Sequence, residues 1–86
     1  GGREGLFMGY LLAFGSAHRA LKAESVLKGA GLTFRLLPAP KALSAFCSLV
    51  ISVEEGDLSH ASATLDAAGV KVKGIYEKQG EEYVKM

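Results

Sequence analysis

The chain has 86 residues, enough for one domain but too few for two independent hydrophobic cores. Ten Lys and Arg residues against nine Asp and Glu give a formal net charge of +1, which offers no case for nucleic acid or an anionic membrane as a partner. An apolar content of 49% argues against disorder, and a single cysteine excludes a disulfide framework and a zinc site of clustered thiolates.

The ends of the chain predict three segments. Residues 1–8 are expected to be loose and to include a remnant of the expression sequence, residues 9–77 to form one domain, and residues 78–86 to form a C-terminal arm or hairpin strand. The apolar stretch from Leu6 to Phe14 is about half as long as a spanning helix and has no signal-peptide features. With its unpaired cysteine, the protein is expected to be cytoplasmic.

The first half of the domain predicts a strand, a helix and a second strand. Tyr10 to Phe14 is a short apolar run that ends at a glycine, which favours a buried strand. Ser16 is placed to cap a helix over Ala17 to Lys28, which has apolar residues at three- and four-residue spacing. Leu32 to Leu37 predicts the second strand, stopped by the prolines that follow it.

The second half repeats this pattern after a short connection. Lys41 to Phe46 has room for one helical turn, and Cys47 to Val53 predicts the third strand. Asp57 is expected to cap a second helix that ends at Gly69. Val70 to Tyr76 predicts a fourth strand. A hairpin around Gln79 and Gly80 is then expected to add a C-terminal strand.

The order β-α-β-β-α-β predicts an α+β fold of the ferredoxin-like kind, a two-layer sandwich with both helices on one face of an antiparallel sheet. The alternative, a small parallel α/β sheet, needs a crossover for which the middle of the chain is too short. In the predicted fold the third strand lies between the first and the second and runs antiparallel to both.

This topology predicts that Cys47 lies beside residues 15–18, the first turn of the first helix. Free amide groups and the positive dipole end there favour an anion, and the cations Lys41, Arg19 and His18 are within reach. His60 is expected at the opposite edge. Two readings remain open for the thiol. A helical turn over 41–46 would place Cys47 at a negative dipole end that raises its pKa, and free cysteine is often a small buried hydrophobe.

Three stretches resemble the selenium/sulfur carrier protein-like family, a group of small, mostly bacterial, cytoplasmic proteins. They are GSAHRALKAESVLKGAG (residues 15–31), RLLPAPKALSAFC (35–47) and VKGIYE (72–77). The resemblance covers residues 9–77 and implies a role in carrying sulfur or selenium on a cysteine. Carried over by position, Cys47 matches the family cysteine, and Ser44, Pro40 and His18 match residues near it. Lys41 replaces the usual arginine, and Ser48 replaces the glycine that usually follows the cysteine.

The resemblance therefore implies a carrier that holds the chalcogen on Cys47, where we expect support from Ser44, His18, Lys41 and Ser16. Enzymatic turnover is not expected, since no third residue orients a Cys47–His18 pair. No metal or cofactor is expected, because Cys47, His18 and His60 cannot converge in this topology. The expected partners are donor and acceptor proteins, not nucleic acid or membrane, and a homodimer stays open.

One competing function comes from a different class. A ferredoxin-like regulatory or small-ligand-binding module would use the amide groups of Ser16 to His18 as an anion site, without thiol chemistry. Cys47→Ser separates the two hypotheses, because it removes the carrier thiol and leaves that anion site intact. A structural role within a larger complex is suggested by small size alone.

Overall fold

The structure is a computed structural model that describes residues 9–45, 47–80 and 82–86. The predictions for residues 1–8 and for Phe46 lie outside the described residues. Within the described residues, neither helix has the length and apolar character that crossing a membrane requires.

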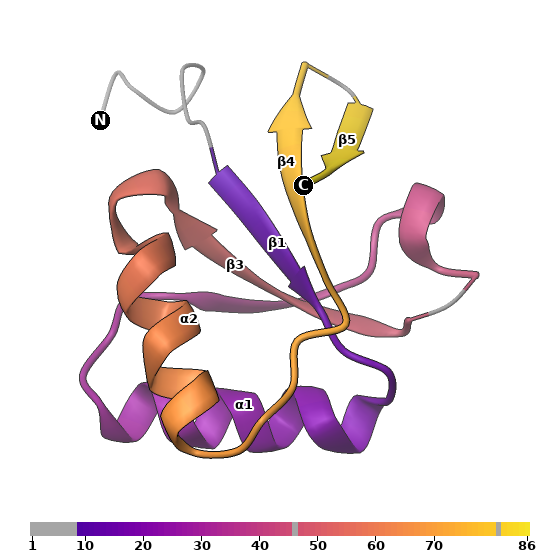
Figure 1. Cartoon of the computed structure of the whole chain (residues 1–86). Coiled ribbons are helices and arrows are strands. Elements are labelled where there is room, and N and C mark those ends of the chain that lie inside the picture. The colour runs from indigo at the N-terminus through magenta and orange to yellow at the C-terminus, as the bar shows by residue number, and fades with distance from the viewer. Residues whose placement is uncertain (1–8, 46, 81) are drawn as a thin grey trace.

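One antiparallel sheet runs through the molecule (Figure 1). Its order is β2-β3-β1-β4-β5, and each neighbouring pair is antiparallel. The strands are β1 (Gly9–Ala13), β2 (Arg35–Pro38), β3 (Leu49–Glu54), β4 (Gly74–Gln79) and β5 (Glu82–Lys85). As predicted, β3 lies between β1 and β2.

Two α-helices and two short 3-10 helices connect the strands. The helices are α1 (Ala17–Gly29), η2 (Lys41–Leu43), η3 (Glu55–Asp57) and α2 (Leu58–Ala67). The predicted α+β class, with two helices and an antiparallel sheet, is confirmed. The sheet has five strands, and the predicted C-terminal strand is confirmed, because β5 pairs with β4 from Gln79 and Glu82 to Tyr76 and Lys85.

The two α-helices begin differently. The Ser16 hydroxyl accepts a hydrogen bond of 3.1 Å from the Arg19 amide, so the predicted N-cap of α1 is confirmed. Asp57 stands at the N-cap of α2, but its side chain makes no capping hydrogen bond there. The preceding turn η3 supplies the entry to α2 instead, because its residues already have helical backbone angles.

Both helices end in the same way, and this explains where two of the strand predictions were wrong. Gly31 and Gly69 each have φ of 76°, and the next residue donates its amide back across the last turn, Leu32 to the Leu27 carbonyl and Val70 to Leu65. Leu32 and Val70 therefore complete helix ends. Consequently β2 and β4 begin later in the chain than Leu32 and Val70, the residues at which they were predicted to start.

The sheet separates two apolar clusters by strand alternation. On one face, Tyr10, Leu12, Ile51 and Val53 pack with residues of both helices, such as Leu27 and Leu65. On the other face, a second cluster contains no residue of either α-helix; it comprises Leu11, Ala13, Leu43, Cys47, Val50 and Tyr76. The loop that carries η2 stands apart from the two α-helices (Figure 1).

Candidate functional site

Cys47 follows η2 and precedes β3 by two residues. Its backbone amide donates to the Leu43 carbonyl at 3.2 Å, and its thiol Sγ donates to the same carbonyl at 3.3 Å. These bonds tie Cys47 to Leu43, the last residue of η2. The prediction that β3 begins at Cys47 was therefore wrong by two residues.

Cys47 lies in the cluster on the sheet face opposite the α-helices, where its side chain is 6% exposed. The buried turn residue Leu43 packs in the same cluster, as does Val50, whose partner in β1 is Ala13. Partly buried side chains surround the cluster, namely Leu37, Ala39 and Tyr83. The thiol is therefore a small member of an apolar cluster, and a reagent cannot reach it without a local movement.

Two opposing effects act on the pKa of the Cys47 thiol. Burial raises this pKa, and the positive charge of Lys73 lowers it by a smaller amount. The hydrogen bond from Sγ to the Leu43 carbonyl also requires the protonated thiol. The net result is a pKa above the ordinary value, and burial is its main cause.

The four residues predicted to support the thiol are all exposed in the structure. Ser44 donates its hydroxyl to the Lys41 carbonyl at 3.0 Å, and Ser16 caps α1. His18 lies in the first turn of α1, and Lys41 begins η2. The structure brings Ser44 and Lys41 into the turn that holds Cys47. For Ser16 and His18 it establishes only that α1 starts at the end of the sheet where Cys47 lies.

Lys73 is the cation that the sequence analysis missed. Its amide donates to the Ala13 carbonyl at 2.8 Å, which fixes it beside the end of β1. Its side chain is exposed, and it influences the Cys47 thiol electrostatically. The signal was present in the sequence, because an antiparallel fourth strand beside the first brings the start of the fourth to the end of the first.

Gly74 is the glycine that the packing of this face requires. A Cβ at position 74 would lie 3.1 Å from Cε1 of the Tyr76 ring, tighter than most side-chain contacts. Tyr76 is itself buried in the cluster that contains Cys47. The absence of a side chain at Gly74 therefore gives room for a ring in this cluster.

Ser48, the residue after Cys47, adopts an ordinary backbone conformation. Among the described residues only glycines have positive φ, so position 48 does not need the freedom of glycine here. The Ser48 carbonyl accepts a hydrogen bond of 2.9 Å from the Ala39 amide. This bond joins the two ends of the η2 loop.

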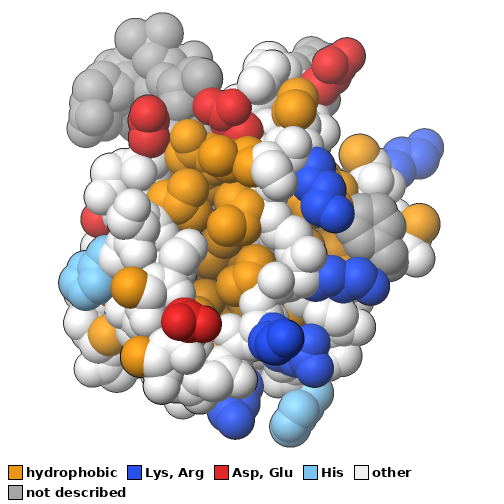
Figure 2. Space-filling model, viewed as in Figure 1, with side chains coloured by type: hydrophobic (Ala, Val, Ile, Leu, Met, Phe, Trp, Pro, Cys, Tyr) orange, Lys and Arg blue, Asp and Glu red, His pale blue; other side chains and the backbone are white. Residues whose placement is uncertain are grey.

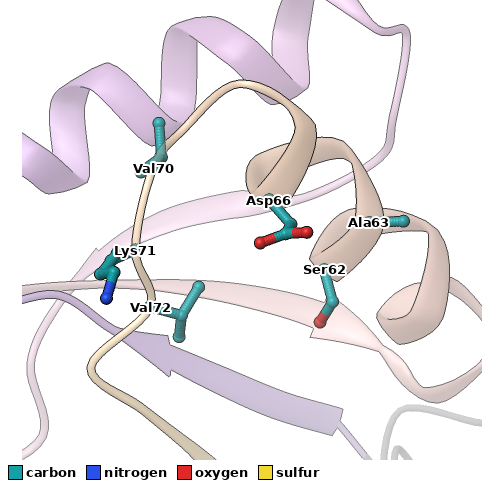
Figure 3. Close-up of a pocket in the computed structure, with 6 residues that line it drawn as sticks. All are labelled: Ser62, Ala63, Asp66, Val70, Lys71 and Val72. Atoms are coloured by element: carbon teal, nitrogen blue, oxygen red, sulfur yellow. The ribbon is translucent and has the colours of Figure 1, made fainter.

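A groove elsewhere on the molecule lies between α2 and the segment that follows it (Figure 3). Asp66 and Ser62 of α2 border it, opposite Val70 to Val72. Because α2 packs on the other face of the sheet, this groove is not part of the Cys47 site. In the described part of the chain, no group of three or more His, Cys, Asp or Glu residues is placed to hold a metal ion.

The fold and the site define a small α+β protein with a single cysteine, buried at the end of a helical turn on the helix-free face of its sheet. A model of the family described as "Putative Se/S carrier protein-like" matches residues 9–77, and the chain belongs to this family. No curated protein and no solved structure shows a significant match.

Proposed function

We propose that this protein carries sulfur or selenium on Cys47, as a persulfide or selenosulfide, and passes it to an acceptor protein. Membership of the carrier-like family is the observation that carries the proposal. The presence of one cysteine in the 86 residues supports it, because no second thiol of the chain can displace the chalcogen by forming an internal disulfide.

Each transfer is a displacement that needs no external oxidant. The Cys47 thiol first loses its proton to water. Its thiolate attacks the terminal sulfur of a donor persulfide, a new sulfur–sulfur bond forms, and the donor's old bond breaks to release the donor thiolate. The acceptor thiolate then attacks the terminal sulfur on Cys47, and the Cys47 thiolate is the leaving group.

Loading requires the η2 turn to open, because the thiol is 6% exposed and donates to the Leu43 carbonyl. Two features support a low cost for this movement. The turn has three residues, and Leu43 is the only one of them that is buried. Opening moves Cys47 away from an apolar cluster, so its pKa falls as the chalcogen donor approaches.

In the opened site, nearby polar residues stabilise the negative charge of the persulfide on Cys47. Lys73 and Lys41 supply positive charge, and the hydroxyl of Ser44 donates to the persulfide anion once it leaves the Lys41 carbonyl. His18 and the first turn of α1, capped by Ser16, supply further donors at the same end of the sheet. The protein is a cytoplasmic carrier in this proposal and does not catalyse a reaction of its own.

The proposal also includes a ferredoxin-like fold. We assign β1 to β4 with the two α-helices to the ferredoxin-like arrangement, and we regard β5 as an edge strand added to it. The position of β3 between β1 and β2 supports this assignment.

Loading is tested by intact-mass measurement of the whole chain after incubation with a cysteine desulfurase and cysteine. We expect the mass to rise by one sulfur atom or more, the increase to be removed by a reductant, and Cys47→Ser to stay unmodified. A second control, Ser48→Ala, leaves the thiol in place and should load normally. If the folded wild type stays unmodified while the urea-unfolded chain is alkylated normally, the carrier proposal fails and the anion-binding module becomes the better hypothesis.

A further inference from the structure

The charged side chains divide between the two ends of the sheet. The opposite end, where Gly9 pairs with Glu54 and Tyr10 with Glu77, carries mostly carboxylates. These are Glu54, Glu55, Asp57, Glu77 and Glu82. Three described cations also lie away from Cys47, namely Lys28, Arg35 and Lys78. The negative charge of the five carboxylates exceeds their positive charge.

The end of the sheet where β1 stops, called here the Cys47 end, is cationic. Its exposed cations are Arg19, Lys22, Lys41, Lys71, Lys73 and Lys85. The Lys85 side chain reaches this end, because its Cε lies 3.6 Å from where a Cβ of Gly74 would stand. Two described carboxylates lie away from the opposite end, namely Asp66 near the end of α2 and Glu24 in the middle of α1, two residues after Lys22.

The same division is visible on the surface of the molecule. Figure 2 shows most acidic side chains gathered along the top and the basic side chains along the right and lower margins. The net charge of +1 hides this separation, because the two groups nearly cancel. Cys47 lies at the cationic end, because it precedes β3 where β3 begins beside the end of β1.

We propose that the Cys47 end is a docking surface for an acidic protein surface, which the donor or acceptor of the chalcogen presents around its own reactive sulfur. This inference rests on the proposed function, since a carrier must meet both partners at its thiol. Opposite charges around two reacting centres raise the rate of encounter and fix the orientation in which the sulfur atoms meet. The acidic opposite end repels the same partner and so excludes an inverted approach.

A protein fits this surface better than nucleic acid. The cations cover one end of a small domain, and the opposite end places carboxylates where a long polyanion would extend. The aromatic rings of Tyr10 and Tyr76 are buried, and Tyr83 is partly buried, so these rings do not form an open platform for stacking bases.

The docking test uses Cys47→Ser, so that its outcome does not depend on thiol chemistry. A peptide of alternating Glu and Ser is titrated into this chain, and backbone amide shifts are followed by NMR. We expect shifts around Lys73 and Lys85 and none around Glu54. Adding Lys73→Glu and Lys85→Glu should weaken binding by about tenfold or more, as expected for the loss of electrostatic attraction.

The matched control adds Lys28→Glu and Lys78→Glu, which change the net charge equally at the opposite end. It should bind the peptide as the parent does. Absence of binding, equal weakening by both pairs, or tighter binding of a DNA duplex than of the peptide would each overturn the proposal. If the peptide docks but Cys47 of the wild type takes up no sulfur, the carrier function fails and the docking surface stands. If Cys47 loads and the peptide does not dock, the reverse holds.

Discussion

The thiol of Cys47 donates a hydrogen bond of 3.3 Å to the carbonyl of Leu43, four residues earlier in the chain. Leu43 is 3% exposed and packs in the same cluster as Cys47. The bond favours the protonated thiol, which is the unreactive form, and ties it to a turn anchored by one leucine. Reactivity at Cys47 is therefore coupled to the position of that turn.

The burial of Cys47 predicts slow alkylation of the folded protein. Because the pKa of the thiol is raised, the fraction present as thiolate at neutral pH is below that of an exposed cysteine. Each unit of pKa lowers this fraction about tenfold, and burial restricts access further. We expect iodoacetamide to react at least about tenfold more slowly with the folded chain than with the chain in urea. Equal rates would contradict the buried position.

Alkaline pH is expected to destabilise the fold through the same thiol. Since the folded pKa of Cys47 lies above 9.0, its ordinary value, the protonated thiol stabilises the fold fully below that pH. The stabilisation is lost as pH rises through the folded pKa. Urea unfolding on either side of pH 9.0 should show a fall in the free energy of unfolding that Cys47→Ala lacks.

Tyr10 supplies the control for the alkaline measurement. Burial raises the pKa of this residue above 10.0, and the charges of Glu77 and Glu55 add to the shift. The loss of its contribution therefore begins near pH 10.0, above the pH near 9.0 at which the loss for Cys47 begins. Tyr10→Phe should retain the fall in the free energy of unfolding that begins near pH 9.0. If Tyr10→Phe lacks this fall, Tyr10 and not Cys47 is its cause.

Leu43→Ala should open the site. Removal of this buried side chain is expected to lower the free energy of unfolding by about 2–3 kcal/mol and to speed alkylation of Cys47, because the turn loses its anchor. Leu21→Ala is the matched control, since Leu21 is 48% exposed on α1. It should cost about 0.5 kcal/mol or less. An unchanged alkylation rate in Leu43→Ala would mean that the turn does not control access.

Gly74→Ala should be destabilising, by about 1–3 kcal/mol, because the new methyl group lies 3.1 Å from the Tyr76 ring. Gly29→Ala is its control. Gly29 is the last residue of α1, and a methyl group added there would meet no neighbouring atom within 4 Å, so alanine should be neutral or stabilising by up to about 1 kcal/mol. Thermal unfolding of the two variants measures the difference.

The sequence predicted the elements well because local signals determine them. Ser16 marks the start of α1, and Gly31 and Gly69 have the positive φ that the two helix ends use. Strand boundaries were less predictable, since apolar residues such as Val70 suit a helix end as well as a strand. The first residue of a strand depends on which carbonyl accepts the hydrogen bond of each backbone amide. Composition does not encode that choice.

The candidate site was predictable in part. Strand topology correctly placed Cys47 at the end of the sheet where α1 begins, and one of the two open readings, a cysteine that is a small buried hydrophobe, matches the structure. Lys73 was missed because the lysines of this part of the chain are scattered among glutamates, a pattern that is typical of a solvated face. Its effect on Cys47 depends on the pairing of Gly74 with Ala13, which links residues distant in sequence.

The release of sulfur from loaded Cys47 tests the central claim most directly. The chain is loaded with heavy-isotope sulfur, separated from the donor, mixed with reduced glutathione and followed by mass spectrometry. A carrier predicts heavy sulfur in glutathione persulfide and the return of Cys47 to the mass of the free thiol, since the acceptor attacks the terminal sulfur. Heavy hydrosulfide in solution, with glutathione left on Cys47 as a mixed disulfide, would contradict the account.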